Sequence, residues 1–340
     1  MFMTQRCGDT LLFRTPPVIA AQAAVGGKKE GKGPLAAAFD ELSSDNRFGQ
    51  SSWEAAEKYL QLRAARLCLQ KAQLPEEKVR LVLAGDLQAQ CTASGYAMRE
   101  LGVPFAGVFG ACSTMAETLG LGAALCASGA AEHLLAMASS HFCAAERQFR
   151  TPLSYGAVRT PTAQWTATAA GAALVGFSGK PPFIRAATVG KIEDMGITDL
   201  NNMGAAMAGA AYDTLTRHMK HRGTHPQDYD VIITGDLGQV GSDLLYDLFQ
   251  RDGVSLREHH KDCGLMIYDR AAQDVHAGGS GCGCSASMMC GHFFKRIQAG
   301  ELKRVLYCAT GALMSPTVVQ QGGSIPGIAH CVEISSEAGG

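Results

Sequence analysis

Charged side chains are scarce in this sequence. They make up 18% of its 340 residues, whereas ordinary soluble domains carry about 25%. The 30 Lys and Arg residues nearly balance the 31 Asp and Glu residues, and 46% of the chain is apolar. Such a composition excludes a disordered protein and a protein steered to nucleic acid by its overall charge. We therefore expect a globular protein with no nucleic-acid partner.

Long apolar runs are also missing. No stretch of about 18 apolar residues is free of glycine or charge, so no transmembrane helix is expected. The most apolar early stretch, Val18 to Val25, is short and broken by Gln22, which is unlike a secretion signal. The twelve cysteines then do not indicate the disulfide framework of a small secreted protein. We expect an intracellular protein with reduced thiols.

The sequence repeats one plan twice. Residues 80–87 (RLVLAGDL) and 230–237 (DVIITGDL) are both apolar runs that end in Gly-Asp-Leu. Residues 109–115 (FGACSTM) and 280–287 (SGCGCSAS) each open a stretch of small residues that is followed by a glycine and an apolar run. The shared order of these features favours a true duplication over two coincidentally similar βαβ units.

Each half is interpreted as strand, helix, strand, glycine- and cysteine-rich turn, long helix and strand. The strands are apolar runs without alternation, as expected for parallel strands covered on both faces. The chain therefore belongs to the α/β class. Glycine and proline punctuate residues 176–182, which predicts two units, residues 1–178 and 179–340.

Two motifs resemble a phosphate-binding loop and a metal site but are interpreted as structural. Residues 26–33 (GGKKEGKG) match most of a phosphate-binding loop, but Gly33 stands where the magnesium-binding Ser or Thr is needed. A surface loop is the better interpretation. Cys282 and Cys284 are one residue apart, whereas structural zinc sites space their thiols by two to four residues and need a second pair. Packing at a tight turn is favoured over metal binding.

Cys112 is a candidate reactive group. It follows an apolar strand and a Gly-Ala step, and it precedes a helix that opens with Ser113 and Thr114. The positive end of a helix dipole favours a thiolate. Free cysteine is also among the most buried residue types. A reactive thiol and a small core residue are both open at this point.

A polar cluster follows the strand expected at residues 134–139. Ligands of doubly wound sheets bind beyond the carboxyl ends of the strands. His141, Arg147 and Arg150 therefore lie where an anionic ligand could be held, and Asp86 and Asp236 end two other strands at the same edge. The arginines could equally form surface ion pairs.

The duplicated halves, Cys112 at the start of the first central helix and the strand opening at residues 170–173 (AGAA) resemble the thiolase superfamily over nearly the whole chain. Residues 109–114 (FGACST) look like the nucleophile segment of the ketoacyl carrier-protein synthases. The resemblance implies a thiolase-like fold in which two duplicated βαβ halves form a five-layered αβαβα architecture.

The resemblance also implies two catalytic partners that this sequence lacks. The synthases add a histidine after the first strand of the second half and an Asn or His in the turn before its long helix. Here these positions fall at Gly235-Asp236 and near Cys282. Condensation needs oxyanion donors and an acid or base near the thiolate, and an aspartate would repel the developing oxyanion. We expect no catalysis; the alternative is an acyl-thioester transferase or ketoacyl synthase-like enzyme that uses Cys112 as nucleophile.

A set of motifs between residues 33 and 316 resembles one family of this superfamily, the stage V sporulation protein AD family. The motifs are 33–35 (GPL), 84–87 (AGDL), 109–114 (FGACST), 140–141 (SH), 145–150 (AERQFR), 196–199 (GITD), 262–265 (DCGL), 277–282 (AGGSGC) and 309–316 (ATGALMSP). The resemblance implies a soluble component of a spore membrane channel complex. Such a component binds pyridine-2,6-dicarboxylic acid (dipicolinic acid), alone or with calcium, for uptake into the developing spore.

Dipicolinate is small, flat and dianionic, so it needs a pocket with a few convergent donors. Helix N-termini at Ser113 and Ser285 could supply some of them, and carboxylate oxygens would suit a calcium chelate. No cofactor and no metal held by the chain itself are expected. The candidate ligand-binding residues are Asp86, Cys112, Ser140, His141, Arg147, Arg150, Asp236 and Cys282.

The resemblance further implies partners and a location. Members of the superfamily usually form dimers through a sheet edge, so we expect a homodimer. Other sporulation channel subunits would be its partners. No lipidation signal is visible, so attachment to the forespore or spore inner membrane would be peripheral and would depend on those partners.

Overall fold

The computed structural model describes residues 4–149 and 159–338. The strands of the first half are β1 (Thr4–Cys7), β2 (Thr10–Phe13), β3 (Val18–Gly26), β4 (Glu41–Leu42), β5 (Leu81–Gly85), β6 (Phe105–Gly107), β7 (Leu134–Ser140), β8 (Trp165–Thr166) and β9 (Ala169–Gly176). Its helices are α1 (Trp53–Ala72), α2 (Thr92–Leu101), α3 (Thr114–Ala127) and α4 (Phe142–Phe149).

The second half follows the same plan. Its strands are β10 (Phe183–Thr188), β11 (Val231–Thr234), β12 (His260–Asp262), β13 (Gly279–Ser280), β14 (Arg304–Ala312) and β15 (Gly327–Ser335). Its helices are α5 (Met203–Arg222), α6 (Gly238–Arg251), α7 (Cys263–Met266), α8 (Cys282–Met288), α9 (Phe294–Gln298) and α10 (Pro316–Gln320). A π-helical turn over Met289–Phe293 joins α8 to α9.

The strand order of the first half recurs in the second. The orders are β6-β5-β7-β9-β3 and β12-β11-β14-β15-β10. In chain order these five strands are β3, β5, β6, β7 and β9 in the first half and β10, β11, β12, β14 and β15 in the second. In both halves the first of the five pairs antiparallel with the fifth, and the fifth pairs antiparallel with the fourth. In both, the second strand lies parallel between the fourth and the third. The duplication predicted from the sequence is thus present in the topology.

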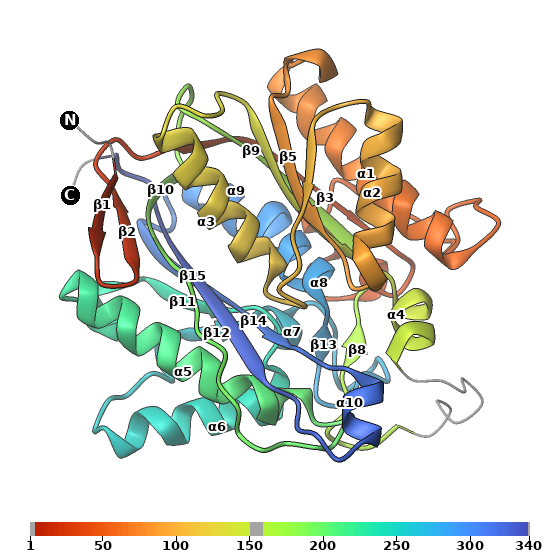
Figure 1. The fold of residues 1–340 in the computed structure, drawn as a ribbon, viewed down its shortest axis with the longest axis vertical. Helices are drawn as coiled ribbons and strands as arrows, with labels where there is room; N and C mark the ends of the chain where they lie inside the picture. The colour runs from red at the N-terminus through yellow and green to blue at the C-terminus, as the bar shows by residue number, and fades with distance from the viewer. Residues whose placement is uncertain (1–3, 150–158, 339–340) are drawn as a thin grey trace.

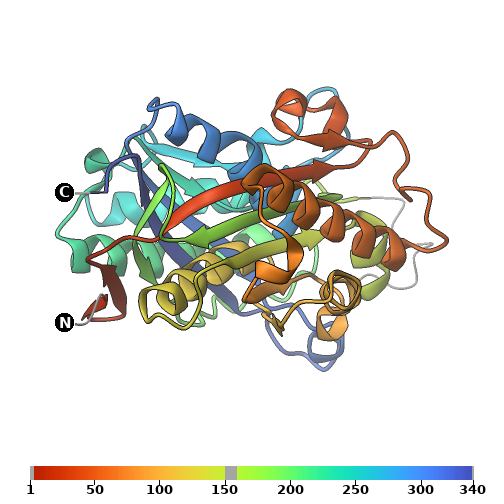
Figure 2. The ribbon, with the colours of Figure 1, turned by 90° about the horizontal axis from the view of Figure 1, so that it is seen from above.

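The elements stack in five layers (Figure 1). α1 and α2 cover the outer face of the first sheet, and α5 and α6 lie against the outer side of the second. α3 contacts strands of both sheets, and α8 packs beside it on β3, β7 and β9. The view from above shows the strands of the first half crossing between α1 and the central helices (Figure 2). The expected αβαβα architecture is confirmed.

Burial on both faces explains the apolar strands. Every residue of β7 and β9 is buried, because helices cover both sides of the sheet. Small side chains allow close packing here: a Cβ at Gly171 on β9 would lie 2.3 Å from the carbonyl oxygen of Ala286 on α8. The abundance of alanine and glycine thus brings the central helices close to the strands.

The two sheets meet where β10 pairs with β3 through Phe183 and Val18, which makes one continuous sheet of 13 strands. All twelve cysteines lie in the described part of the chain, and none is joined in a disulfide. Within residues 4–149 and 159–338, no helix is long and apolar enough to cross a membrane.

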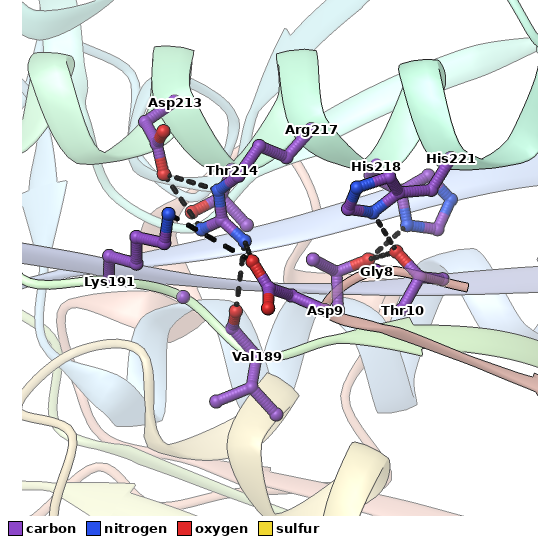
Figure 3. A network of polar contacts seen from close by, with 12 residues as sticks. Gly8, Asp9, Thr10, Val189, Lys191, Asp213, Thr214, Arg217, His218 and His221 are labelled. Atoms are coloured by element: carbon purple, nitrogen blue, oxygen red, sulfur yellow. Dashed lines mark hydrogen bonds and ion pairs between the residues drawn. The ribbon is translucent and has the colours of Figure 1, made fainter. Parts of the chain in front are cut away.

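The N-terminal hairpin β1-β2 is fastened to α5 (Figure 3). Arg217 Nη1 donates to Asp9 Oδ2 at 3.0 Å, and the same guanidinium pairs with Asp213. Thr10 Oγ1 lies 2.9 Å from His221 Nδ1. The hairpin therefore belongs to the second half in space, although it lies at the start of the sequence.

The loop over residues 26–33 is not the simple surface loop that we expected. Glu30 is fully buried, and its Oε1 accepts a hydrogen bond from the Thr168 amide at 3.0 Å and one from the Tyr268 hydroxyl. Burial raises the pKa of Glu30. The acidic residue in the middle of the motif thus anchors the loop to the junction of the two halves.

Candidate functional site

Two neighbouring hollows lie at the carboxyl ends of the central strands. The first, called the inner cavity below, is small, with a volume of about 30 Å³. Its lining residues are Leu87, Phe109, Ala111, Cys112, Ala145, Phe149, Thr166, Met203, Ser280, Ala312 and Met314. Both halves of the chain thus contribute to it, as the position of Cys112 at a strand end predicts.

A wider vestibule of about 550 Å³ adjoins the inner cavity. The two share Leu87, Phe109, Phe149 and Met314. The other residues around the vestibule are Gln88, Ala89, Gln90, Gln148, Ser315, Pro316, Thr317 and Gln320. Its polar lining therefore consists of amides and hydroxyls.

The turn that presents Cys112 is built from both halves. Ala111 adopts a φ of +49°, and the Ser113 amide and hydroxyl both donate to the Gly110 carbonyl, at 3.0 and 2.6 Å. α3 begins at the next residue. Gly311 on β14 packs against this turn so closely that a Cβ would lie 2.3 Å from Gly110 O. The second half thus supports the loop that holds Cys112.

Cys112 faces Ser280 and Asp236. Its Sγ lies 3.9 Å from Ser280 Oγ, which donates to Asp236 Oδ2 at 3.0 Å. The same carboxyl oxygen accepts from the Gly281 amide at 2.9 Å, and Oδ1 accepts from Thr310 Oγ1 at 3.1 Å. The position where the synthases carry histidine is therefore occupied by a buried acid that contacts the cysteine.

These surroundings disfavour a thiolate. Burial and the negative charge of Asp236 raise the pKa of Cys112 well above its usual value. The effect of burial therefore outweighs that of the helix N-terminus, which favours the small core residue among the two interpretations that the sequence leaves open. Free cysteine behaves here as a small, weakly polar lining residue.

The pKa of Asp236 is raised as well. Burial raises its pKa to about 6, although the hydrogen bonds that it accepts oppose the shift. A second buried acid, Asp262, lies close by with a pKa of about 7, raised by burial and by the charge of Asp236. Asp262 accepts from the amides of Leu237 and Gly238. This carboxyl therefore organises the start of α6.

Cys282 and Ser140 join the two halves behind the cavity. Cys282 Sγ donates to the Ser139 carbonyl at 2.8 Å. Ser140 Oγ donates to Ala167 O at 2.7 Å and accepts from the Gly283 amide at 3.2 Å. Burial raises the pKa of Cys282 well above its usual value. Both side chains are thus bonded to backbone, and neither lines the inner cavity.

His141 is bonded to backbone as well. Its Nε2 donates to Asn46 O at 2.8 Å, and its Nδ1 accepts from the Cys143 amide at 3.2 Å. The ring lies against Trp53, with centroids 5.5 Å apart, and burial lowers its pKa. The structure therefore places a neutral imidazole beside the cavity wall and not in the lining.

Arg147 is half-exposed and pairs with Glu54 on α1. This is the surface ion pair that the sequence left open, although the acidic partner comes from a distant part of the chain. Arg150 lies outside the described residues. Asp86 is buried and accepts from the amides of Gln88 and Ser94 at 2.9 and 2.8 Å, so it organises the start of α2.

The helix N-terminus that we expected at Ser285 lies elsewhere. α8 begins at Cys282 with Gly281 as its N-cap, so Ser285 is inside the helix. No lining residue of the two hollows among those described is a lysine, arginine or histidine. Within residues 4–149 and 159–338, no group of three or more His, Cys, Asp or Glu side chains could hold a metal ion.

Several residues around the cavity carry no signal in the sequence. Ser280 lies within the motif at residues 277–282, but only the structure shows that it bridges Cys112 and Asp236. The apolar walls come from separated segments, and Met203 and Met314 are examples. Hydrophobic side chains at unrelated positions are ordinary core residues until the fold brings them together.

Comparison with known proteins places this geometry in a family. Residues 7–335 match the family described as Stage V sporulation protein AD. The chain is 44% identical over 332 residues to "Stage V sporulation protein AD" of Bacillus subtilis (strain 168), covering 98% of both chains.

Solved structures share the fold at low identity. A 3-oxoacyl-[acyl-carrier-protein] synthase III from Aquifex aeolicus VF5 is 14% identical with a TM-score of 0.57, covering 94% of this chain and 99% of that one. A variant of OleA from Xanthomonas campestris is 13% identical with a TM-score of 0.58, covering 94% and 98%. The fold is thus that of the ketosynthases, and the chain belongs to the stage V sporulation protein AD family.

Proposed function

We propose that this protein binds dipicolinate, as its calcium chelate, in the vestibule and the mouth of the inner cavity, and does not catalyse acyl transfer. The single observation that carries the proposal is the contact of Cys112 with Ser280 and Asp236 in place of a basic partner. The ligand is the one that the family resemblance implies.

The acidic neighbour argues against catalysis. A nucleophilic cysteine needs a base or a cation that stabilises its thiolate. Asp236 does the opposite, because it raises the pKa of the thiol and would repel an oxyanion. His141 is bonded to the Asn46 carbonyl. Its hydrogen bonds therefore hold it away from the role of catalytic base.

The charge and shape of the two hollows favour the chelate over the free dianion. A pyridine ring suits the apolar walls of Leu87, Phe109 and Met314. Free dipicolinate carries two negative charges, whereas its one-to-one calcium chelate is neutral. Neutral amides such as Gln88 and Gln148 at the vestibule can hydrogen-bond the carboxylates of a neutral chelate without an added cation, and calcium accepts oxygen ligands readily.

Calorimetry tests the proposal. Titration with dipicolinate plus calcium should saturate at one ligand per chain, and titration with dipicolinate alone should give weaker binding. Cys112→Phe fills the inner cavity and should abolish binding. Cys7→Phe is the matched control at the half-buried N-terminal hairpin. Absence of saturable binding in the wild type, with or without calcium, would overturn the proposal.

The alternative function is an acyl-thioester enzyme. It is favoured only by the exposure of Cys112 to the inner cavity. Incubation with acyl-CoA followed by intact-mass measurement distinguishes the two functions. A binding protein should show no added mass, whereas a stoichiometric adduct in the wild type that is absent from Cys112→Ala would establish the enzyme.

We also propose a homodimer that acts with other sporulation channel subunits at the forespore or spore inner membrane. β6 ends the strand order of the first sheet and pairs only with β5 among the described strands. Its three residues are exposed, and Phe109 and Tyr96 nearby are 49% and 53% exposed. An unpaired apolar edge strand is suited to pairing with a second copy. Sedimentation should give twice the chain mass, and Ala106→Pro should reduce it.

A further inference from the structure

A buried chain of hydrogen bonds lies behind the vestibule and joins two carboxyl groups. Ser139 Oγ donates to Glu57 Oε1, and Gln61 Nε2 donates to Ser139 Oγ, both at 3.1 Å. Gln61 Nε2 also lies 3.0 Å from Ser94 Oγ. The Ser94 hydroxyl then donates to Asp86 Oδ2 at 2.6 Å. All five side chains are buried.

Gln88 closes this chain into a ring. Its backbone amide donates to Asp86 Oδ1 at 2.9 Å, and its Nε2 donates to Glu57 Oε2 at 2.7 Å. Gln88 also belongs to the segment of residues 87–91, called the rim loop below, of which residues 87–90 line the vestibule. The ring therefore connects the core of the first half directly to the rim of the ligand site.

The rim loop needs this support. Gln90 and Cys91 adopt φ values of +63° and +53°, a region that residues other than glycine rarely occupy. Such a conformation persists only where its surroundings enforce it. The contacts that do so are the bonds to Gln88, the bond from the Cys91 amide to Gln88 O at 3.2 Å, and the bond from the Cys91 thiol to Val108 O.

At neutral pH the two carboxyl groups of the ring, Glu57 and Asp86, are not both fully ionised. Burial and the charge of Asp86 raise the pKa of Glu57 to about 8. Glu54 on the same helix adds negative charge, whereas the thiol of Cys282 on α8, which also faces Glu57, is kept neutral by burial. Arg147 on α4 is paired with Glu54 on the surface. Glu57 is therefore mostly protonated at neutral pH and ionises as the pH rises past about 8.

We propose that Glu57 is a positioning residue of the ligand site, whose hydrogen bond to Gln88 holds the rim loop closed at the edge of the vestibule. Ionisation of Glu57 at high pH places two negative charges in one buried ring. The two carboxylates repel each other and both need solvation, so the ring opens to water and the strained rim loop loses its anchor. The inference rests on the proposed function only for the identity of the ligand.

Amide hydrogen exchange on the unliganded protein tests the clamp without any ligand. The amides of Gln88 and Ser94 both donate to Asp86, so their protection reports the closed loop. Relative to intrinsic exchange rates, wild-type protection should fall about tenfold between pH 6.5 and pH 9. Glu57→Gln keeps the shape but not the charge, and its protection should be the same at both pH values. Glu57→Ala should be unprotected at both.

Glu100→Gln is the matched control, because Glu100 is a half-exposed carboxylate that pairs with Lys58 on the surface of the same helices. It should behave as the wild type does. Equal wild-type protection at both pH values, or a loss in Glu57→Gln as large as in the wild type, contradicts the proposal. The comparison of these two proteins decides the question even where Glu57→Ala fails to fold.

A ligand measurement separates this inference from the proposed function. The wild-type affinity for calcium dipicolinate should weaken several-fold from pH 6.5 to pH 9, and that of Glu57→Gln should not. Absence of binding in both proteins overturns the proposed function, while hydrogen exchange still decides whether Glu57 holds the rim loop.

Discussion

Asp236 and Cys112 meet through Ser280 at the junction of the two halves, where the serine hydroxyl lies 3.9 Å from the thiol and donates to the carboxyl at 3.0 Å. Asp236 opposes ionisation of the thiol, whereas the contact with Cys112 favours ionisation of Asp236 against the effect of burial. The pKa of the thiol rises well above its usual value, and that of Asp236 rises to about 6 because it is buried. A ketosynthase fold therefore contains a nucleophile position at which the nucleophile is held protonated.

Removal of the charge at Asp236 should activate the thiol. In Asp236→Asn the pKa of Cys112 should fall, and its alkylation by iodoacetamide at pH 8 should accelerate about tenfold for each unit of that fall. Peptide mass spectrometry measures the rate at Cys112 alone. Asp243→Asn, on the exposed side of α6, is the control. An unchanged alkylation rate at Cys112 would show that burial alone, and not Asp236, raises the pKa of the thiol.

Glu333 should stabilise the fold most above its unfolded pKa of about 4.5. Arg222 and Arg304 bond to this buried carboxyl at 2.8 to 3.2 Å. Burial raises its pKa, but the contacts with His218 and Arg222 lower it by more, so the net shift is downward. Glu333→Gln should cost about 3 kcal/mol at pH 7. Because the folded pKa is lowered, this contribution is lost as pH falls below about 4.5.

Urea unfolding at pH 7 and at pH 3.5 measures this effect. The difference in unfolding free energy between wild type and Glu333→Gln should be smaller at the lower pH. The exposed Glu337→Gln serves as control. A difference in unfolding free energy that stays constant, or that increases in acid, contradicts the assigned direction of the Glu333 pKa shift.

Gly311 should couple fold stability to ligand affinity. Gly311→Ala places a methyl group against Gly110 O, so it should destabilise by roughly 1–3 kcal/mol or more and displace the Cys112 turn. Gly95→Ala is the matched control, because Gly95 lies in α2 with open space around it. That change should stabilise by about 0.5–1 kcal/mol and leave calcium dipicolinate affinity unchanged. If both variants change the unfolding free energy and the ligand affinity equally, the close packing of Gly311 on the Cys112 turn does not have this role.

The sequence predicted the parts of this molecule that depend on local pattern. Apolar runs before each Gly-Asp-Leu motif predicted β5 and β11, and the small-residue stretch after Cys112 predicted α3. The confirmed repeat of strand order follows from the paired motifs. These features depend on burial on two faces and on tight turns, which leave a direct imprint on residue type.

Contacts between distant segments could not be predicted in this way. Arg147 meets Glu54 across 93 residues, and Glu57 reaches Gln88 through the packing of α1 on the first sheet. The state of Cys112 also stayed open, because a helix N-terminus is a local feature of the sequence whereas burial and the contact with Asp236 are not. Electrostatic environment is a property of the assembled core, and so are the cavity walls.

The most direct test of the account is protection of Cys112 by ligand. A small methylthiolating reagent, which transfers CH₃S to the thiol to form a mixed disulfide and releases its leaving group, should reach Cys112 through the inner cavity, and half-buried Cys7 and Cys143 serve as internal references. Calcium dipicolinate should slow modification of Cys112 to saturation, over the same concentrations that saturate calorimetric binding, and leave the references unchanged. Saturable binding without protection of Cys112 would place the ligand elsewhere and contradict the account.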